Sequence, residues 1–559
     1  MRGPPRPWRR ETSTRLWTAG GTGAAVAESV YGGYGPAGGV AGGHGGVSTT
    51  ARGAPEGVLG RQSARGAHEG ILRRQAARES AARTYARALP VVPVRARGLT
   101  IEGADGRRYL DCLSGDGTLA LGHNHPVVLE AIRGVLDSGA PLQALDLATP
   151  VKDAFVTELF RTLPPGLADH ARVRFCGPAG TDAVEAAFEL VRAATGRTGI
   201  LAFTGAHHGM ATGAPEAPDD ASDVRVGRLP SPQDYRCPFG IGSAYGAELA
   251  ARWTESVLDD PGSGVPSPAG MIVEPVQEEG GVIPAPDEWM RRIRRITAAR
   301  SIPLIADEIQ TGVGRTGAFW AVEHSGVTPD VMILSKAIGG SLPLAVIVHR
   351  DDLDLRQPGA HADAFRGNQL AMAAGTATLA YVRENGLAGR AGELGARMLV
   401  QLRGLAGEFA CVGDVRGRGL MIGVEFVDRD SAREAEGAFA GEGTGGVALE
   451  DERAAGGAGG GRPGSDTASP QRLAHGPRPA AGSAHGSRPA AAPELAAAVQ
   501  QECLRRGLIV ELGGRNASVV RLLPPLTITD EQATAVLNRL SDAVEAVARG
   551  RTDGGHQLG

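Results

Sequence analysis

The chain has 559 residues, 42% of them hydrophobic, which is enough apolar material for one large or two medium-sized domains. Its net charge of −4 gives no reason to expect nucleic-acid binding, and no run of about 18 apolar residues predicts a membrane span. The five cysteines are scattered, without metal-ligand spacing or a disulfide framework, so we expect a reducing, cytoplasmic location.

The N-terminal region, residues 1–77, is predicted to be a disordered extension. Its first 50 residues are rich in Gly, Ala and Arg with little periodicity, and the basic start is not followed by the apolar segment of a secretory signal. A duplication follows, in which ARGAPEGVLGRQSA recurs as ARGAHEGILRRQAA. Two copies are too few to stack into a repeat domain, so we interpret them as a lengthened tail.

From about residue 85 the pattern becomes that of a folded domain. Residues 99–113 predict a β-hairpin around an Asp-Gly turn, and residues 125–139 predict an amphipathic helix. Short apolar strands then alternate with helices: strands at 171–177, 198–205, 269–276, 302–309 and 329–335, and helices at 181–195 and 287–300. This alternation predicts an α/β domain with a mostly parallel sheet.

Residues 430–492 interrupt this pattern with a stretch of Gly, Ala, Pro, Ser and Arg. It contains a second short duplication, AHGPRPAA and AHGSRPAA, and is predicted to be a flexible insertion. Beyond it we expect a helix at 493–507, a strand pair around LIVELGG and VVRLLPP, and a closing helix that starts at Asp530.

Lysine is almost absent from the chain. Of 58 basic residues only Lys152 and Lys336 are lysines, and the other 56 are arginines. Arginine stays protonated in proteins, whereas lysine can become a neutral amine nucleophile. Lys336 ends the apolar run DVMILSK and is followed by small residues and glycines, which suits an amine that forms a Schiff base.

A carboxylate is expected near this amine. Asp307 ends the apolar run PLIAD and lies 29 residues before Lys336, about one strand–helix–strand unit. Neighbouring parallel strands would place both at their carboxyl ends, where open α/β sheets bind ligands. A lysine with an aspartate there fits pyridoxal phosphate, because the aspartate can pair with the pyridinium nitrogen.

Three further segments are candidate parts of this site. Gly180 and Thr181 lie in a glycine-containing turn at a predicted helix start, which suits a phosphate group. His207, in a His-His-Gly turn after a strand, could cover a cofactor ring. Arg416, between glycines, could bind a substrate carboxylate, although a solvated turn arginine would give the same pattern.

Taken together, these segments resemble the class III, or ω-, aminotransferases of the type I pyridoxal-phosphate-dependent transferase fold. The motifs are specific and stand in the family order: GTDAVEAA, VEPVQEEGG, ADEIQTGVGRTG, LSKAIGG, FRGNQLA and VRGRGLM. The resemblance covers about residues 78–430 and 493–548. It implies a large domain with a mostly parallel seven-stranded sheet, a smaller α/β domain and a homodimer.

The resemblance also implies roles for single residues. Lys336 would form the Schiff base and move the proton, Asp307 would hold the pyridinium nitrogen, and Gln310 would bond the ring oxygen. Gly180 and Thr181 would bind phosphate, and Glu274 would lie in the active-site region. Arg416 would bind a carboxylate of 2-oxoglutarate, and Glu279 would pair with Arg416 when an amine enters instead. These roles are stated for residues of this sequence that match the family motifs.

Segments such as LDLATPVKDAFV and SVVRLLPPLTITDEQA resemble the members that transaminate L-2,4-diaminobutyrate with 2-oxoglutarate. Other amine donors, namely ornithine, acetylornithine and 4-aminobutyrate, remain alternatives, as does a weakened or non-catalytic relative. The last alternative is motivated by His207, where the family usually has Tyr or Phe, and by Ala364, where it usually has Thr. Asp116 and Glu278 also replace residues that are usually small.

The predicted organisation follows from these segments. Its parts are a disordered extension (1–77), the start of the small domain (78–112), the large cofactor-binding domain (113–365), the first part of the C-terminal small domain (366–429), the disordered insertion (430–492), the second part of the small domain (493–548) and a disordered tail (549–559).

Overall fold

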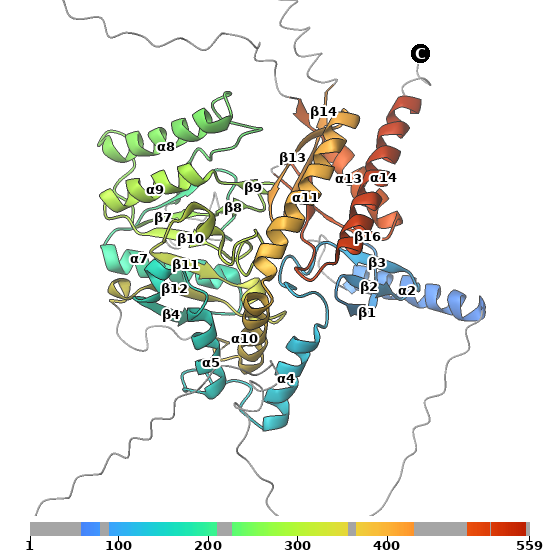
Figure 1. The fold of residues 1–559 in the computed structure, drawn as a ribbon, viewed down its shortest axis with the longest axis horizontal. Coiled ribbons are helices and arrows are strands. Elements are labelled where there is room, and N and C mark those ends of the chain that lie inside the picture. Colours follow the sequence, from blue (N-terminus) through green and yellow to red (C-terminus); the bar gives the residue numbers. More distant parts are fainter. Residues whose placement is uncertain are drawn as a thin grey trace, which may run out of the picture.

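A seven-stranded sheet lies within one half of the molecule, on the left in Figure 1. The computed structural model describes residues 58–78, 89–209, 226–355, 365–429, 489–514 and 516–554. The strands, in spatial order, are β4 (Ala171–Phe175), β12 (Val346–Arg350), β11 (Val331–Leu334), β10 (Leu304–Asp307), β7 (Gly270–Val273), β5 (Ile200–Phe203) and β6 (Val226–Leu229). Strand β12 is antiparallel to both neighbours and all other pairs are parallel. The predicted α/β fold with a mostly parallel seven-stranded sheet is confirmed.

The inner strands β5, β7, β10 and β11 are buried along their whole length because both faces of the sheet are covered there. Ile272, Ile305 and Ile333 belong to one buried core, which they share with helix α7 (Gly180–Thr195). Their neighbours Leu304 and Met332 belong to a second buried core on the opposite face. Successive side chains of a strand point to opposite faces, so each strand supplies both cores.

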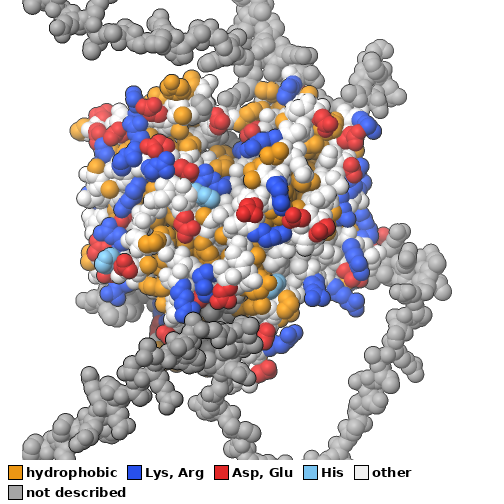
Figure 2. Space-filling view, in the orientation of Figure 1, with side chains coloured by type: hydrophobic (Ala, Val, Ile, Leu, Met, Phe, Trp, Pro, Cys, Tyr) orange, Lys and Arg blue, Asp and Glu red, His pale blue; other side chains and the backbone are white. Residues whose placement is uncertain are grey.

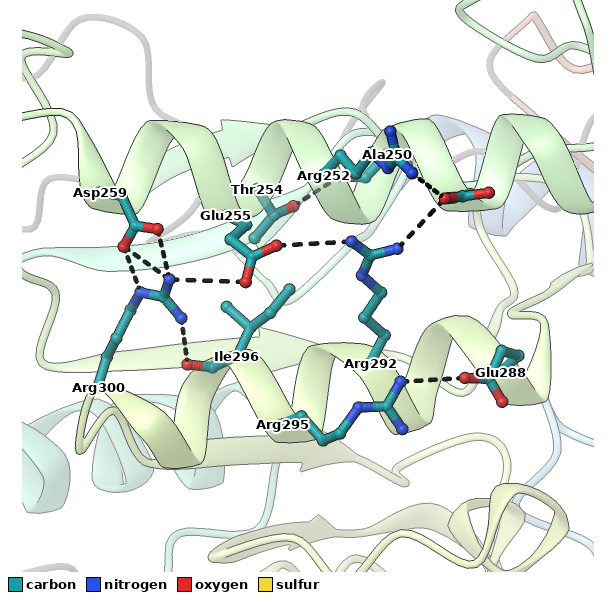
Figure 3. A network of polar contacts seen from close by, with 11 residues as sticks. Ala250, Arg252, Thr254, Glu255, Asp259, Glu288, Arg292, Arg295, Ile296 and Arg300 are labelled. Atoms are coloured by element: carbon teal, nitrogen blue, oxygen red, sulfur yellow. Dashed lines mark hydrogen bonds and ion pairs between the residues drawn. The ribbon is translucent and has the colours of Figure 1, made fainter. Parts of the chain in front are cut away.

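Helices α8 (Ser243–Asp259) and α9 (Asp287–Ala299) lie side by side at one end of the molecule (Figure 1). Ion pairs join them (Figure 3). Just beyond α9, Arg300 binds Asp259 at 2.6 Å and lies 3.8 Å from Glu255. Arg292 approaches Glu255 to 3.5 Å. This network shows how the arginines of this lysine-poor chain hold two amphipathic helices together.

Further helices and a short ribbon complete the part of the molecule around this sheet. They are the helices α4 (Pro126–Ser138), α5 (Pro150–Phe160), α6 (Pro165–Ala168) and α10 (Gln369–Glu384), the short helices η2 (Ala321–Ser325), η3 (Lys336–Gly339) and η4 (Asp351–Leu353), and the two-stranded ribbon of β8 (Val276–Gln277) and β9 (Ile283–Pro284). Helix α10 packs against both α4 and α5.

Besides the ribbon of β8 and β9, there are two smaller sheets among the described residues, and the first combines segments from both ends of the chain. One has the order β1 (Pro93–Arg97), β2 (Thr100–Gly103), β3 (Arg108–Asp111) and β16 (Leu508–Ile509). The other has the order β13 (Val412–Arg418), β14 (Met421–Asp428), β18 (Val519–Leu522) and β17 (Glu511–Gly513), and β15 (Ala490–Ala491) pairs with β14. Helices α11 (Leu387–Glu408), α13 (Pro493–Arg505) and α14 (Asp530–Gly554) accompany them. The predicted hairpin is present as β2 and β3.

Three segments predicted to be disordered contain regular structure. Val58–Arg78 forms helix α2, Ala490–Ala491 forms β15, and α14 continues to Gly554. Helix α2 contains the second copy of the N-terminal duplication, whose Ala, Arg, Gln and Leu residues have high helix propensity despite the low sequence complexity. The remainder of the extension and residues 430–488 of the insertion lie outside the described residues.

The visible surface carries charges of both signs. Figure 2 shows Lys and Arg side chains interspersed with Asp and Glu over the face that it displays. Across the described residues, no helix has both the length and the apolar character that crossing a bilayer requires.

Candidate functional site

A cavity of about 260 Å³ lies at the carboxyl ends of the central strands. Strands β10 and β11 are parallel neighbours, which brings Asp307 at the end of β10 close to the residues that follow β11. Eight of the nine predicted site residues line this cavity, and Arg416 does not. The eight are Gly180, Thr181, His207, Glu274, Glu279, Asp307, Gln310 and Lys336.

Lys336 begins helix η3 directly after β11 and projects its amine into the cavity. Its backbone has a φ of 51°, the left-handed region, which is rare for a residue with a side chain. Its Nζ donates to Asp116 Oδ2 at 2.6 Å and also contacts Gln310 Oε1. The side chain is 23% exposed. The amine is therefore held by polar groups inside the cavity and is open to a ligand.

Asp116 is a site residue whose role the sequence did not reveal. It accepts from Gln310 Nε2 at 3.2 Å in addition to its contact with Lys336, so one carboxylate holds both side chains. It has a φ of 57° in a turn with Gly115 and Gly117. Its appearance at a position where the family that the sequence resembles usually has a small residue was the only signal.

Asp307 is held by His208 rather than by a cation. His208 Nδ1 lies 2.8 Å from Asp307 Oδ2, and the backbone N–H of Ile309 donates to Asp307 Oδ1 at 3.2 Å. Asp307 and His208 are both buried. The histidine thus fixes one carboxylate oxygen, and the pair orients Asp307 at the cavity wall.

The two histidines of the His-His-Gly turn have different environments. His207 is exposed and lines the cavity, where its backbone N–H donates to Glu274 Oε1 at 2.9 Å. His208 points inward, and its Nε2 has no hydrogen-bond partner in the described part of the chain. His207 was predicted from the sequence as a site residue and His208 was not. The shape of the turn decides which of the two adjacent histidines is buried, and the sequence does not show that shape.

Glu274 is a buried acid beside Asp307. Burial first, and then the charge of Asp307, hold the pKa of Glu274 well above its usual range. Its Oε2 is buried and has no hydrogen-bond partner within the described ranges. A carboxyl group in this position favours its protonated form, which avoids a second negative charge next to Asp307.

The start of helix α7 forms one wall of the cavity. The first N–H groups of a helix have no partner within the helix, and its dipole favours an anion at this end. A Cβ atom on Gly180 would lie 2.9 Å from Ile309 Cδ1, so a side chain here would require the Ile309 side chain to shift. Asp182 Oδ2 accepts from the backbone N–H of Ala179 at 2.9 Å and orders the turn.

Arg416 is engaged elsewhere. Its Nη1 donates to Glu425 Oε2 at 2.6 Å and to Asp414 Oδ2 at 2.9 Å, and its Nε donates to the carbonyl of Gly281 at 2.8 Å. The predicted pair with Glu279 is therefore not formed. Antiparallel pairing of β13 with β14 places Arg416 opposite Gly423, close to Glu425 on the same neighbouring strand.

Arg521, on β18, is the arginine that reaches the acids of the cavity. It is 2% exposed, donates to Glu278 and lies 2.8 Å from Glu511 and 3.5 Å from Glu279. Glu278 and Glu279 line the cavity. The sequence analysis missed Arg521, although an arginine in the middle of the apolar strand VVRLL was a signal, because such a charge needs a buried partner.

Known proteins with similar sequences identify the family of this chain. The family described as aminotransferase class III matches residues 81–452. A diaminobutyrate–2-oxoglutarate aminotransferase of Rhizobium meliloti is 47% identical over 84% of this chain and 91% of its own length. The protein of the same name from Haemophilus influenzae is 40% identical over 83% of this chain and 93% of its own length.

Solved structures give the same result for the fold. An amine transaminase from an uncultivated Pseudomonas species, in a pyridoxal-phosphate-bound form, is 26% identical and superposes with a TM-score of 0.65 over 84% of this chain and 97% of its own. An ω-transaminase of Thermomicrobium roseum, at 24% identity, superposes with a TM-score of 0.67 over 86% of this chain and 98% of its own. The chain therefore belongs to the class III aminotransferase family.

Proposed function

We propose that this class III aminotransferase uses pyridoxal phosphate to transfer the terminal amine of L-2,4-diaminobutyrate to 2-oxoglutarate, which yields L-aspartate 4-semialdehyde and L-glutamate. The names of the relatives at 47% and 40% identity support this pair of substrates. The observation that carries the proposal is the placement of Lys336, Asp307 and the start of α7 around one cavity.

The residues of the cavity fit the cofactor. The amine of Lys336, at the end of β11, suits the aldehyde of the cofactor, and the Asp307 carboxylate, oriented by His208, suits its pyridinium nitrogen. The N-terminus of α7, where Gly180 leaves room, suits its phosphate. Lys336 would bind it covalently, Asp307 would pair with the ring nitrogen, Gln310 would contact the ring oxygen, and His207 would cover the ring. When bound, the cofactor supplies an electron sink for the carbon that carries the amine.

The protein then has to move a proton and orient two substrates. The Lys336 amine would take a proton from the substrate carbon that carries the amine and hold it for the second transfer. In this proposal Asp116 and Gln310 hold that amine between transfers, because both contact its Nζ. Glu274, as a buried neutral acid, keeps a second charge away from Asp307.

Arg521 takes the substrate-binding role that the sequence analysis gave to Arg416. A carboxylate of 2-oxoglutarate would bind its guanidinium in a bidentate fork. Glu279, whose side chain is 48% exposed, would cover Arg521 when the diamine is bound and turn into solvent when the dicarboxylate enters. One cavity would then accept a cationic and a dianionic substrate in turn.

Assembly and location extend the proposal. We infer a homodimer, which the apolar side chains exposed beside one another on residues 142–147 and at Phe365 support. The cross-subunit position Ala364 lies outside the described residues. Five free cysteines support a reducing, cytoplasmic location. We also infer a large domain (113–365) and a small domain assembled from 78–112, 366–429 and 493–548.

The visible absorbance of the purified protein with pyridoxal phosphate tests the function. Diaminobutyrate alone is expected to remove the band of the lysine-bound cofactor, and 2-oxoglutarate is expected to restore it. Lys336→Ala is the control, which should show neither change. A faster first step with ornithine or 4-aminobutyrate would contradict the proposed donor, and a protein that stays colourless with excess cofactor would contradict catalysis.

A further inference from the structure

Glu278 and Glu279 are adjacent acids with opposite environments. They follow the short strand β8, and both line the cavity. The Glu279 side chain is 48% exposed, whereas that of Glu278 is 7% exposed. Glu279 can leave its position for water, and Glu278 has no such route. The difference matters because both acids approach the same atom of Arg521.

That atom, Nη1 of Arg521, contacts Glu278 and lies 3.5 Å from Glu279. The second amino group, Nη2, lies 2.8 Å from Glu511. The third nitrogen, Nε, has no hydrogen-bond partner among the described residues and faces Gly513, where a Cβ atom would lie 2.6 Å away. Because Glu278 occupies Nη1, a dicarboxylate can reach that atom only after Glu278 has given up its contact.

The charges around this arginine are predominantly negative. Oxygen atoms of Asp116, Glu278 and Glu511 lie within 4.8 Å of one another, and Glu279 adds a fourth carboxylate. The facing cations are Arg521 and Lys336. Burial raises the pKa of Glu278 to about 8, against the attraction of Arg521. If Arg521 turned to another carboxylate, Glu278 would be a buried charge without a partner, and a proton would remove that cost.

We propose that Glu278 is a specificity-determining residue, which makes the binding of a dicarboxylate at Arg521 depend on the uptake of a proton by the Glu278 carboxylate. Above about pH 8, where Glu278 is ionised in the free protein, one proton is taken up when the dicarboxylate binds and is released when it leaves. A cationic amine substrate needs no such proton, because it can enter while Glu278 remains ionised on Arg521. The inference rests on the proposed role of Arg521 in binding 2-oxoglutarate.

The test uses glutarate, a dicarboxylate without the reactive oxo group, with the full-length protein loaded with pyridoxal phosphate. Isothermal titration calorimetry from pH 6.5 to 9.5 gives its affinity, and buffers of different ionisation enthalpy give the protons taken up. The wild-type affinity is expected to fall by about tenfold per pH unit above pH 8, with uptake approaching one proton.

Glu278→Gln is expected to remove both the slope and the proton uptake while it keeps the side-chain volume. Glu278→Gly is a second variant in case the amide disturbs the buried cluster. Glu279→Gln is the matched control, which should raise the affinity at every pH and keep the slope. An unchanged slope in both Glu278 variants, or a wild-type affinity independent of pH, would overturn the proposal.

The same experiment separates this inference from the proposed substrates. If diaminobutyrate fails to remove the cofactor band but the affinity for glutarate still depends on pH through Glu278, the proposed donor is wrong and the role of Glu278 is supported. If both half-reactions proceed as expected but the affinity for glutarate does not depend on pH, the role of Glu278 is wrong and the proposed substrates are supported.

Discussion

Replacement of Asp116 by Asn should make Lys336 more reactive toward amine reagents in the protein freed of cofactor. Asp116 Oδ2 accepts from Lys336 Nζ at 2.6 Å, and a reagent has to displace this charge-assisted hydrogen bond before it can reach the amine, whereas the neutral amide of asparagine accepts more weakly. The Asp116 side chain is 40% exposed and that of Lys336 is 23% exposed, so solvent limits the pair to about 1 kcal/mol. The loss of about 1 kcal/mol of contact energy corresponds to an expected gain of about fivefold in the modification rate.

The scarcity of lysine makes the assay unusually clean. Reductive methylation followed by peptide mass spectrometry has only two lysines to count, Lys336 and Lys152. Lys152 lies on α5 with its Nζ 4.9 Å from the centre of the Phe175 ring, and it serves as the internal reference. The measured quantity is the ratio of the two methylation rates in the wild type and in the variant.

Two controls bound the interpretation of this ratio. Asp137→Asn, on the exposed end of α4, should leave the ratio unchanged. Pyridoxal phosphate should protect Lys336 in the wild type and leave Lys152 reactive. A ratio in Asp116→Asn equal to that of the wild type would refute the reasoning, because it would mean that the carboxylate does not hold the amine in solution.

Three other changes test the cavity and its support. Gly180→Val should weaken pyridoxal phosphate binding by at least tenfold in equilibrium dialysis, because even the Cβ atom would lie 2.9 Å from Ile309 Cδ1; unchanged binding would argue against this wall as the phosphate site. Asp330→Asn should lower the free energy of unfolding by about 3 kcal/mol in urea at pH 7, since two arginines bind this buried carboxylate. Burial alone would raise the pKa of Asp330, but hydrogen bonds from those arginines and from a backbone N–H lower it. The contribution of Asp330 to the free energy of unfolding is therefore present above pH 3.8 and is lost as the pH falls through its pKa in the folded state. A variant whose stability depends on acid pH in the same way as that of the wild type would contradict this. Arg300→Ala should cost about 1 kcal/mol at low salt and less in 1 M salt, because its acidic partners on α8 are partly exposed (Figure 3).

Much of the fold followed from local patterns. The strands were predicted because apolar runs of four to eight residues between helices indicate a covered parallel sheet, and all five lie within the seven-stranded sheet. The remaining two strands, β6 and β12, were not predicted. The ordered parts of the low-complexity regions were also missed, because composition alone does not show that Ala490–Ala491 can pair with the end of strand β14.

The candidate site divides in the same way. Lys336, Asp307 and Gly180 were identified from the sequence because each follows a buried strand or opens a helix, and parallel strands bring their carboxyl ends to one edge. Asp116 and His208 were not identified as functional, since their contacts lie across turns that no local pattern predicts. Their partners are 220 and 99 residues away in the chain.

The two arginines Arg416 and Arg521 show most clearly what the sequence could not determine. By itself the sequence indicated the family fold, the lysine that we propose forms the Schiff base and the strand ends that surround it, because these depend on short-range periodicity and on the spacing of neighbouring strands. Only the tertiary structure decided that Arg521, and not Arg416, meets the acids of the cavity. Arg416 and Arg521 lie on strands β13 and β18 of one sheet, which are each antiparallel to β14 between them. The strand register determines which guanidinium meets Glu278, a residue 243 positions away from Arg521 in the chain.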